Sequence, residues 1–280
     1  MVNSTPTRRA GQQSLLVGLA LALFTAVNLL PILHAVLTSL KYPVDAFAVP
    51  AKWLFTPTLD YHRAIWVEKD FLRYLGNSTV IALGTVALSV PVGTLAAYAL
   101  SRLRTRRSQA LLFGLLAIRM FPRMLLVVPF FVLAKVLGLF DTRLVVILAM
   151  VAFNQPFTIW LMRGFFLDIP LELDEAARID GCNAFQVFWR VVLPVAKPGL
   201  VVTTLFSLLL AYNEFLFPLV LTGTEAKPLP VAISEYGAEN IEYWSLSAAG
   251  AIGIMAPIVI FMILVQRHIV RGLTFGALKG

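Results

Sequence analysis

The sequence predicts an all-helical protein that crosses a membrane several times, and three observations indicate this. Of its 280 residues, 59% are hydrophobic and 14% are charged, whereas soluble domains carry about a quarter charged residues. The mean hydropathy is +0.83. Six stretches are apolar over the roughly 20 residues that a helix needs to span a bilayer. One polar segment, 169–194, lies between the fourth and fifth stretches and is too polar to insert.

The six predicted spans form one transmembrane domain that covers residues 1–280. The first lies apart, at 14–38; its apolar run is too long for a secretory signal, so we expect it to be retained. The other five form a core region at 74–266, and residues 267–280 are a predicted cytoplasmic tail. The spans are Leu15–Leu37, Leu75–Leu100, Gln109–Val132, Leu144–Met162, Gly199–Leu221 and Leu246–Val265. Prolines in or near them predict broken helices, which membrane proteins tolerate where neighbouring groups satisfy the freed carbonyls.

The distribution of lysine and arginine predicts the orientation of the spans. Basic residues cluster before the first span, in 102–107, in 163–197 and after the last span, and they are sparser on the opposite side outside its long first loop. The more basic side of a membrane protein faces the cytoplasm. Six spans then place both termini in the cytoplasm and the acidic loop Thr222–Ser245 outside.

Several functional classes are excluded by composition. The net charge of +8 comes from short basic clusters beside apolar runs, so it sets orientation and predicts no nucleic-acid partner. A single cysteine, Cys182, excludes an intrachain disulfide. The three histidines are far apart and lack metal-ligand spacing. Without a nucleophile–base pair or a metal cluster, we predict no catalytic residue and no metal site, and we discount an intramembrane enzyme.

The polar segment 169–194 predicts two short helices joined at a glycine, an arrangement called the elbow below. Pro170 suits the start of the first helix, and Gly181 can end it in a left-handed turn. Its predicted apolar face consists of Leu173, Ala176 and Ala177.

The second helix of the elbow has a predicted start and stop. Asn183 is its expected N-cap, with Gln186 in the capping-box position. Leu193-Pro194 is expected to end it and to return the chain to the bilayer. Its predicted apolar stripe consists of Phe185, Phe188 and Val192. From composition alone, the elbow either touches another protein or lies on the lipid headgroups.

The spacing within the elbow resembles a known motif. Glu175-Ala176-Ala177, three residues, Gly181, nine residues, Val191, one residue and Leu193-Pro194 is similar to the EAA motif of permease subunits of ABC (ATP-binding cassette) importers. Val191 departs from the isoleucine that is usual there. The stretches 169–181, 212–217 and 272–280 resemble the carbohydrate branch, the maltose-type inner-membrane permeases. The resemblance extends from about the first span to the last residue.

This resemblance implies a fold and a function. It implies a type I ABC importer permease in the bacterial inner membrane, surrounded by lipid, that imports a sugar, polyol or related compound by alternating access. Its implied partners are a second homologous permease, two ATPase subunits that bind ATP and Mg, and an extracytoplasmic solute-binding protein, which the outer loop would approach. The chain has no Gly-x-x-x-x-Gly-Lys-[Ser/Thr] motif, so it is expected to hold no cofactor and to hydrolyse no ATP.

The resemblance also implies that the elbow is a coupling helix seated on the ATPase. The implied contact residues are Glu172, Glu175, Ala176, Ala177, Arg178, Asp180, Gly181, Phe185, Leu193 and Pro194. In that family the C-terminal tail enters the ATPase dimer, which here implies Thr274, Gly276 and Lys279.

Three ionisable residues lie within predicted spans, where charge is costly and faces a bundle interior or a water-filled cavity. Arg119 and Arg123 share a face of the third span, and Glu214 lies in the fifth. Counting about 1.5 Å per residue puts Arg123 and Glu214 at a similar depth, so we expect Glu214 to pair with Arg123 or Arg119 near the outer half of the pathway. The pair either clamps two helices or contacts the solute.

The predicted lining of a passage adds four polar or aromatic residues to these three. The added residues are Asn154, Gln155, Tyr212 and Asn213. Each can instead form a hydrogen bond between helices. An alternative function is a secondary transporter driven by an ion gradient, with Glu214 as the proton carrier; the absence of an internal sequence repeat weakens it.

Overall fold

The computed structural model describes residues 7–103, 105–236 and 243–274, and all regular structure in these ranges is helical. Among them, four helices are long and apolar enough to cross a membrane. Two sharply bent helix pairs, Arg106–Met120 with Arg123–Val136 and Ala184–Val195 with Lys197–Tyr212, bring the number to six if each pair counts as one span. The prediction of an all-helical polytopic membrane protein is therefore confirmed. The described chain divides into two compact units, 1–69 with 235–253, and 70–234 with 254–280.

The first unit contains the predicted first span and the loop after it. The span lies in α1 (Thr7–Ser39), and two short helices follow, α2 (Pro43–Ala46) and α3 (Asp60–Glu68). Lys41 ties the loop together because its Nζ donates to the carbonyl of Lys52 at 2.7 Å and lies 4.8 Å from the centre of the Phe55 ring.

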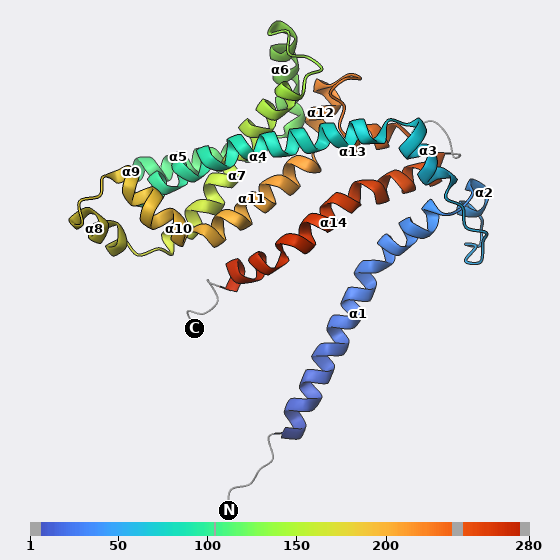
Figure 1. Cartoon of the computed structure of the whole chain (residues 1–280), viewed down its shortest axis with the longest axis horizontal. Coiled ribbons are helices and arrows are strands. Elements are labelled where there is room, and N and C mark those ends of the chain that lie inside the picture. Colours follow the sequence, from blue (N-terminus) through green and yellow to red (C-terminus); the bar gives the residue numbers. More distant parts are fainter. Residues whose placement is uncertain (1–6, 104, 237–242, 275–280) are drawn as a thin grey trace, which may run out of the picture. The chain divides into compact units, whose positions relative to one another are not determined.

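The second unit is built around three helices that run side by side (Figure 1). They are α4 (Phe71–Arg102), α7 (Arg143–Leu167) and α11 (Lys197–Tyr212). Close approach depends on glycine: a Cβ on Gly93 of α4 would lie 2.5 Å from Cγ2 of Thr158 on α7. Small residues at interfaces allow such packing in a membrane, where no water drives helices together.

Two predicted spans are interrupted in the structure. The third span, Gln109–Val132, consists of α5 (Arg106–Met120) and α6 (Arg123–Val136), which meet at a 90° bend. Pro122 lies in the bend, where its ring and missing N–H disfavour a continuous helix.

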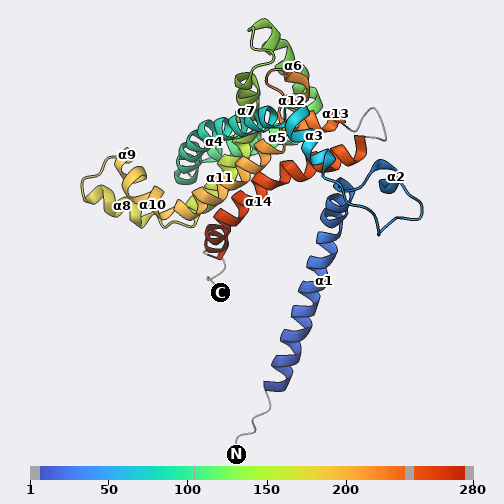
Figure 2. The same ribbon diagram turned by 45° about the vertical axis from the view of Figure 1, so that its right-hand side comes forward.

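The fifth predicted span, Gly199–Leu221, is also interrupted. It stops at the end of α11 and resumes as α12 (Leu216–Leu221). α12 packs beside α6 (Figure 2), where the rings of Phe130 and Phe217 are 5.6 Å apart.

The remaining helices complete the chain. After the short α13 (Leu229–Tyr236), α14 (Trp244–Thr274) contains the predicted sixth span and divides between the two units. Prolines inside helices do not always break them, because α4 and α7 continue through Pro91 and Pro156.

Candidate functional site: an elbow and a charged cluster

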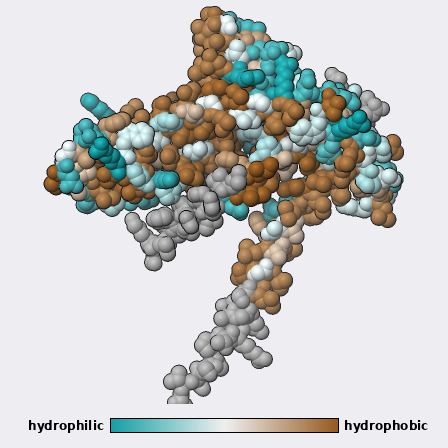
Figure 3. Space-filling model, in the orientation of Figure 1, coloured by the Kyte–Doolittle hydropathy of each residue, from teal (hydrophilic) through white to brown (hydrophobic). Residues whose placement is uncertain are grey.

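The predicted elbow forms a distinct structure at one end of α4 and α7 (Figure 1). It contains α8 (Glu172–Ile179), α9 (Ala184–Gln186), a π-helical segment (Val187–Val192) and α10 (Leu193–Val195). Hydrophilic and hydrophobic residues are mixed on the surface of this end, whereas hydrophobic residues predominate along the middle of the bundle (Figure 3). The polar segment therefore folds as a compact extension of the bundle.

The predicted apolar face of α8 is only partly buried within this chain. Of Leu173, Ala176 and Ala177, only Ala177 is buried, and Asp174 is buried beside it. A buried carboxylate is costly unless it is paired. The structure provides that partner from α4.

Arg102, the last residue of α4, binds Asp174 through two nitrogens. Its Nε donates to Oδ2 at 3.0 Å and its Nη2 donates to Oδ1 at 2.8 Å. The Tyr98 hydroxyl also donates to Oδ2, at 2.7 Å. Only 14% of the Arg102 side chain and 6% of the Asp174 side chain are exposed, so this is a largely desolvated bidentate pair.

The same guanidinium also binds the end of α7. Nη1 of Arg102 donates to the carbonyls of Phe166 at 3.0 Å and Ile169 at 3.3 Å. Carbonyls at a helix C-terminus lack partners within the helix and attract cations. Sequence reasoning treated Arg102 only as a marker of orientation, although Tyr98 four residues earlier shares its helix face.

Gly181 makes the turn between the two halves of the elbow, as predicted. Its φ is +86°, in the left-handed region that disfavours residues with a side chain. A Cβ at this position would meet nothing within 4 Å, so the requirement for glycine comes from the backbone conformation alone.

The second half of the elbow begins as predicted. Asn183 and Gln186 form a capping box in which each side chain accepts a hydrogen bond from the other residue's backbone N–H at 2.9 Å. Phe188 and Val192 of the predicted apolar stripe are buried, together with Val187 of the π-helical segment, whereas Phe185 is 67% exposed.

The elbow ends slightly later than predicted. Leu193-Pro194 does not stop the helix, which continues through Val195 because proline fits the first turn of α10. The chain then bends by 79° between Ala184–Val195 and Lys197–Tyr212. The return to the bilayer therefore occurs at Ala196.

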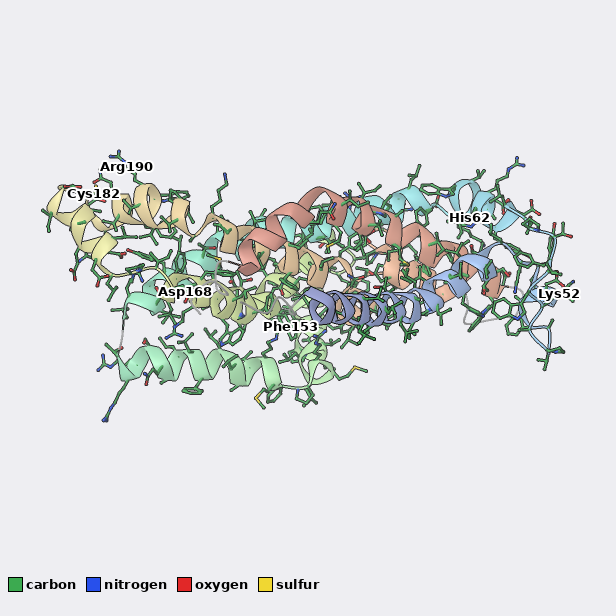
Figure 4. All side chains as sticks on the ribbon, turned by 90° about the horizontal axis from the view of Figure 1, so that it is seen from below. Lys52, His62, Phe153, Asp168, Cys182 and Arg190 are labelled. Atoms are coloured by element: carbon green, nitrogen blue, oxygen red, sulfur yellow. The ribbon has the colours of Figure 1, made fainter. Side chains whose placement is uncertain are left out.

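The outer surface of the elbow combines charged and large apolar side chains. Ile179 is 86% exposed and Trp189 is 50% exposed. Cys182 and Arg190 lie at its far end, beyond Asp168 at the end of α7, and Arg190 points away from the molecule (Figure 4). The exposed predicted contact residues are Glu172, Glu175, Ala176, Arg178, Asp180, Gly181, Phe185 and Pro194. Exposed apolar residues among polar ones are typical of protein interaction sites.

Of the three predicted tail residues, the structure describes one. Thr274 is the last residue of α14, and Gly276 and Lys279 lie outside the described residues.

The predicted intramembrane ion pair is confirmed. Nη1 of Arg123 donates to Oε2 of Glu214 at 3.1 Å, and Oε1 of Glu214 accepts from the backbone N–H of Leu216 at 3.1 Å. Arg123 is the first residue of α6, and Glu214 lies between α11 and α12. The ion pair therefore joins the two interrupted spans.

Arg119 and Arg123 each lie close to an aromatic ring of α7. The guanidinium of Arg123 lies 4.6 Å from the centre of the Phe153 ring, and that of Arg119 lies 4.8 Å from the centre of the Phe157 ring. Phe153 lies midway along the bundle (Figure 4). Cation–π contacts of this kind strengthen where water is excluded.

The other predicted lining residues lie in different surroundings. The Asn154 amide is buried and donates to Oγ of Ser207 at 3.0 Å, and Ser207 lies 3.3 Å from Oγ of Ser89. Asn154 therefore links helices. Gln155 has a buried side-chain oxygen with no hydrogen-bond partner in the described part of the chain.

Tyr212 and Asn213 lie in different surroundings although they are adjacent. Tyr212 is buried and lines an apolar cavity of about 190 Å³ between α4, α11 and α14. Asn213 is exposed, and its amide donates to the carbonyl of Leu209 on its own helix at 2.9 Å. Among the described residues, no group of three His, Cys, Asp or Glu side chains could hold a metal ion.

Together, the interrupted spans and the protruding elbow define a polytopic membrane permease. The chain belongs to the family of binding-protein-dependent transport system inner membrane components, whose model matches residues 89–275. Permeases of this family are the translocation subunits of ABC transporters, and the ATPase activity resides in separate subunits. The matched region includes the elbow and the charged cluster, which consists of Arg119, Arg123 and Glu214.

Individual relatives match over nearly the whole chain. The trehalose transport system permease protein SugB of Mycobacterium tuberculosis is 40% identical over 258 residues, which cover 90% of this chain and 93% of that protein. The trehalose/maltose transport system permease protein MalG of Thermococcus litoralis is 34% identical, with 85% and 89% covered. A solved bacterial ABC transporter involved in import of the acidic polysaccharide alginate contains a similar chain, with a TM-score of 0.72, 27% identity and coverage of 95% and 99%.

Proposed function

We propose that this chain is a permease subunit of a binding-protein-dependent ABC importer for a carbohydrate, in the sense of a sugar, polyol or related compound. The observation that carries this proposal is the family match together with relatives named for trehalose, maltose and maltodextrin transport. The chain alternates between inward-open and outward-open states. The alternative, an ion-gradient transporter with Glu214 as proton carrier, lacks comparable support, because Glu214 is engaged by Arg123.

The elbow is the surface on which a partner ATPase docks. Its exposed carboxylates, such as Glu175, are available to a basic partner, and Phe185 and Ile179 offer apolar area. Gly181 and the capping box hold the two halves at a defined angle. Movement of the ATPase on nucleotide binding would therefore displace the whole elbow.

The charged cluster lies beside the passage. Arg123 and Glu214 join the two broken spans, and broken helices in transporters accompany substrate pathways. Arg119, Gln155, Tyr212 and Asn213 complete the proposed lining, and Asn154 contributes by fixing α7 against α11. The solute would pass when the bend between α5 and α6 moves away from the break between α11 and α12.

The complete importer contains further subunits. We infer a second homologous permease, two ATPase subunits that bind ATP and Mg, and an extracytoplasmic solute-binding protein. Both termini lie in the cytoplasm, and the membrane is the bacterial inner membrane. The tail residues Thr274, Gly276 and Lys279 reach the ATPase from that side.

Purification and reconstitution test this proposal. The chain should co-purify with a Walker-A ATPase and a second permease, and proteoliposomes with ATP inside should take up a sugar or polyol presented by the binding protein. A protonophore should leave uptake unchanged. Uptake that needs no ATP but collapses with the proton gradient would instead support the alternative function. Within the active complex, Glu175→Lys should lower uptake while membrane insertion stays normal.

A further inference from the structure

The first helix of the elbow is attached to the bundle by very few side chains. Of the eight residues of α8, only Asp174 and Ala177 are buried. Ala177 contributes to an apolar cluster with Val187 and Phe188, and such contacts have no preferred direction. Asp174, by contrast, accepts three hydrogen bonds from side chains of α4.

The covalent connection to α8 lies outside regular structure. α7 ends at Leu167 and α8 begins at Glu172, and the residues between them are non-helical. Such a segment can absorb a change of angle through its backbone dihedrals, as hinges do. The side-chain contacts of α8 are therefore a second route, beside the chain itself, by which movement of α8 can reach the bundle.

Arg102 is the residue at which these contacts converge. One guanidinium binds Asp174 of α8, the carbonyl of Phe166 in the last turn of α7 and the carbonyl of Ile169 in the segment that follows. It belongs to α4, and it lies 5.5 Å from the centre of the Tyr98 ring, which itself packs against Phe166 and Phe188. The planar guanidinium donates in fixed directions, so it constrains α4, α7 and α8 relative to one another.

We propose that Arg102, assisted by Tyr98, is a positioning residue that transmits displacement of the elbow to α4 and α7. This inference rests on the proposed function and assigns the internal joint of its coupling. Arg102 acts through Asp174 and does not touch the ATPase or the solute. Without the Arg102 guanidinium, α8 can move together with the ATPase while α4 and α7 keep their positions. ATP is then hydrolysed without uptake of solute.

The test measures solute taken up per ATP hydrolysed, in proteoliposomes that contain the complete transporter. Arg102→Gln should lower this ratio by at least about fivefold, the low end of measured coupling effects between sites, while ATP hydrolysis continues and the ATPase still co-purifies. Arg102→Lys keeps the charge but loses the bidentate geometry and should give an intermediate ratio. Arg106→Gln removes the same charge from an exposed position at the start of α5 and should leave the ratio unchanged.

Two further variants separate positioning from folding. Tyr98→Phe keeps the ring and removes one hydrogen bond, so it should fold and lower the ratio even if Arg102→Gln does not assemble. The exchange of Arg102→Asp with Asp174→Arg should recover part of the ratio that either single reversal loses.

The outcomes distinguish this inference from the function on which it rests. Wild-type transport together with unchanged ratios in Arg102→Gln and Tyr98→Phe would overturn the inference alone. A wild-type complex that shows no ATP-driven uptake would overturn the proposed function, and the inference with it.

Discussion

At the scale of single residues, Arg123 and Glu214 show that an ionised side chain within a predicted span needs a partner of opposite charge. Glu214 is buried and Arg123 is its partner at 3.1 Å. Removing Arg123 would leave the buried Glu214 carboxylate without a counter-charge, at a cost below that of a fully buried pair because 45% of the Arg123 side chain is exposed. The ring of Phe153 adds a second contact to the guanidinium. The pair therefore stabilises the bend and the break that it connects.

Exchanging the two charges tests this pair. Arg123→Glu and Glu214→Arg should each lower the melting temperature of the detergent-solubilised protein and reduce uptake, because each places like charges together. The double exchange should recover most of both losses, since the attraction is restored. A double variant that is no better than the single variants would show that the two residues do not interact.

Asp141 organises a loop outside the spans. Its two carboxylate oxygens accept hydrogen bonds from four successive backbone N–H groups, those of residues 223–226. Burial alone would raise the pKa of the Asp141 carboxyl, but the four donors outweigh it and leave this pKa below its ordinary value. The ionised form is therefore the one that holds the loop.

The pH dependence of this contribution follows from the direction of the shift. A lowered folded-state pKa means that the stabilisation is fully present above the ordinary value of 3.8 and is lost as the pH falls through the folded-state pKa. Asp141→Asn should therefore speed amide exchange at residues 223–226 equally at about pH 5 and about pH 8. A difference that varies between these two pH values would contradict the assignment.

A contact between two side chains could be predicted from the sequence only where both are charged and lie within predicted spans. Arg123 and Glu214 were expected to pair because both lie deep in spans and at a similar depth. Arg102 and Asp174, 72 positions apart, gave no such signal. Arg102 lies at a span end, where arginine is common, and Asp174 belongs to a helix that looks solvent-exposed. Only tertiary packing brings them together.

At the scale of elements, the elbow depends on one backbone conformation. Gly181 (φ +86°) and Gly138 (φ +67°) both adopt left-handed conformations, and a Cβ at either would meet nothing within 4 Å. An alanine in this region costs about 1–2 kcal/mol. Alanine is therefore expected to cost a similar amount at both positions, but only Gly181 lies in the elbow.

Alanine substitution at these two positions separates strain from coupling. Gly181→Ala and Gly138→Ala should lower the free energy of unfolding by similar amounts, about 1–2 kcal/mol. Only Gly181→Ala should also reduce uptake per ATP, because relief of the strain changes the angle between the two halves of the elbow. Equal uptake per ATP in both variants would show that the angle between the two halves of the elbow does not affect coupling.

Close contact between helices gives a second element-scale prediction. A Cβ on Gly199 of α11 would collide with the ring of Phe165 on α7, whereas one on Gly164 would meet nothing within 4 Å. Gly199→Ala should destabilise the protein by about 1–3 kcal/mol. Gly164→Ala should be neutral or stabilising by up to about 1 kcal/mol, since alanine favours helix. Thermal unfolding in detergent measures both, and equal effects would contradict the packing.

The apolar stretches predicted which helices exist, but not where two of them break. Pro122 lies in a 90° bend, whereas Pro91 and Pro156 lie within continuous helices. The break at 213–215 contains no proline. There the carboxylate of Glu214 binds the N–H of Leu216, so a side chain replaces a helical hydrogen bond. Which proline bends a helix is decided by its neighbours.

At the scale of the second unit, α4 connects two regions that the proposed cycle would move. Its end at Arg102 holds the elbow. Near its start, the amide of Asn77 donates to the carbonyls of Glu225 and Lys227 at 2.9 and 2.8 Å, and its oxygen accepts from Nε of Arg143 at 2.7 Å. A single helix thus carries contacts to the elbow and to the loop that Asp141 organises.

The turn of the elbow was predicted from sequence, because the spacing of Glu175, Gly181 and Pro194 is distinctive, and Gly181 has the expected conformation. The contacts of Arg102 behind the elbow were not predicted. Local patterns describe one helix at a time, whereas the contacts of Arg102 depend on three helices meeting.

The central claim is that the elbow rests on an ATP-hydrolysing subunit, and Cys182 offers a direct test. It is the only cysteine in the sequence, and it lies partly exposed in the elbow beside Gly181. A thiol-reactive photo-cross-linker on Cys182, activated in native membranes, should join this chain to a polypeptide with a Walker-A motif, and nucleotide should change the yield. Cross-links to lipid alone, or to no ATPase under any nucleotide condition, would contradict the account.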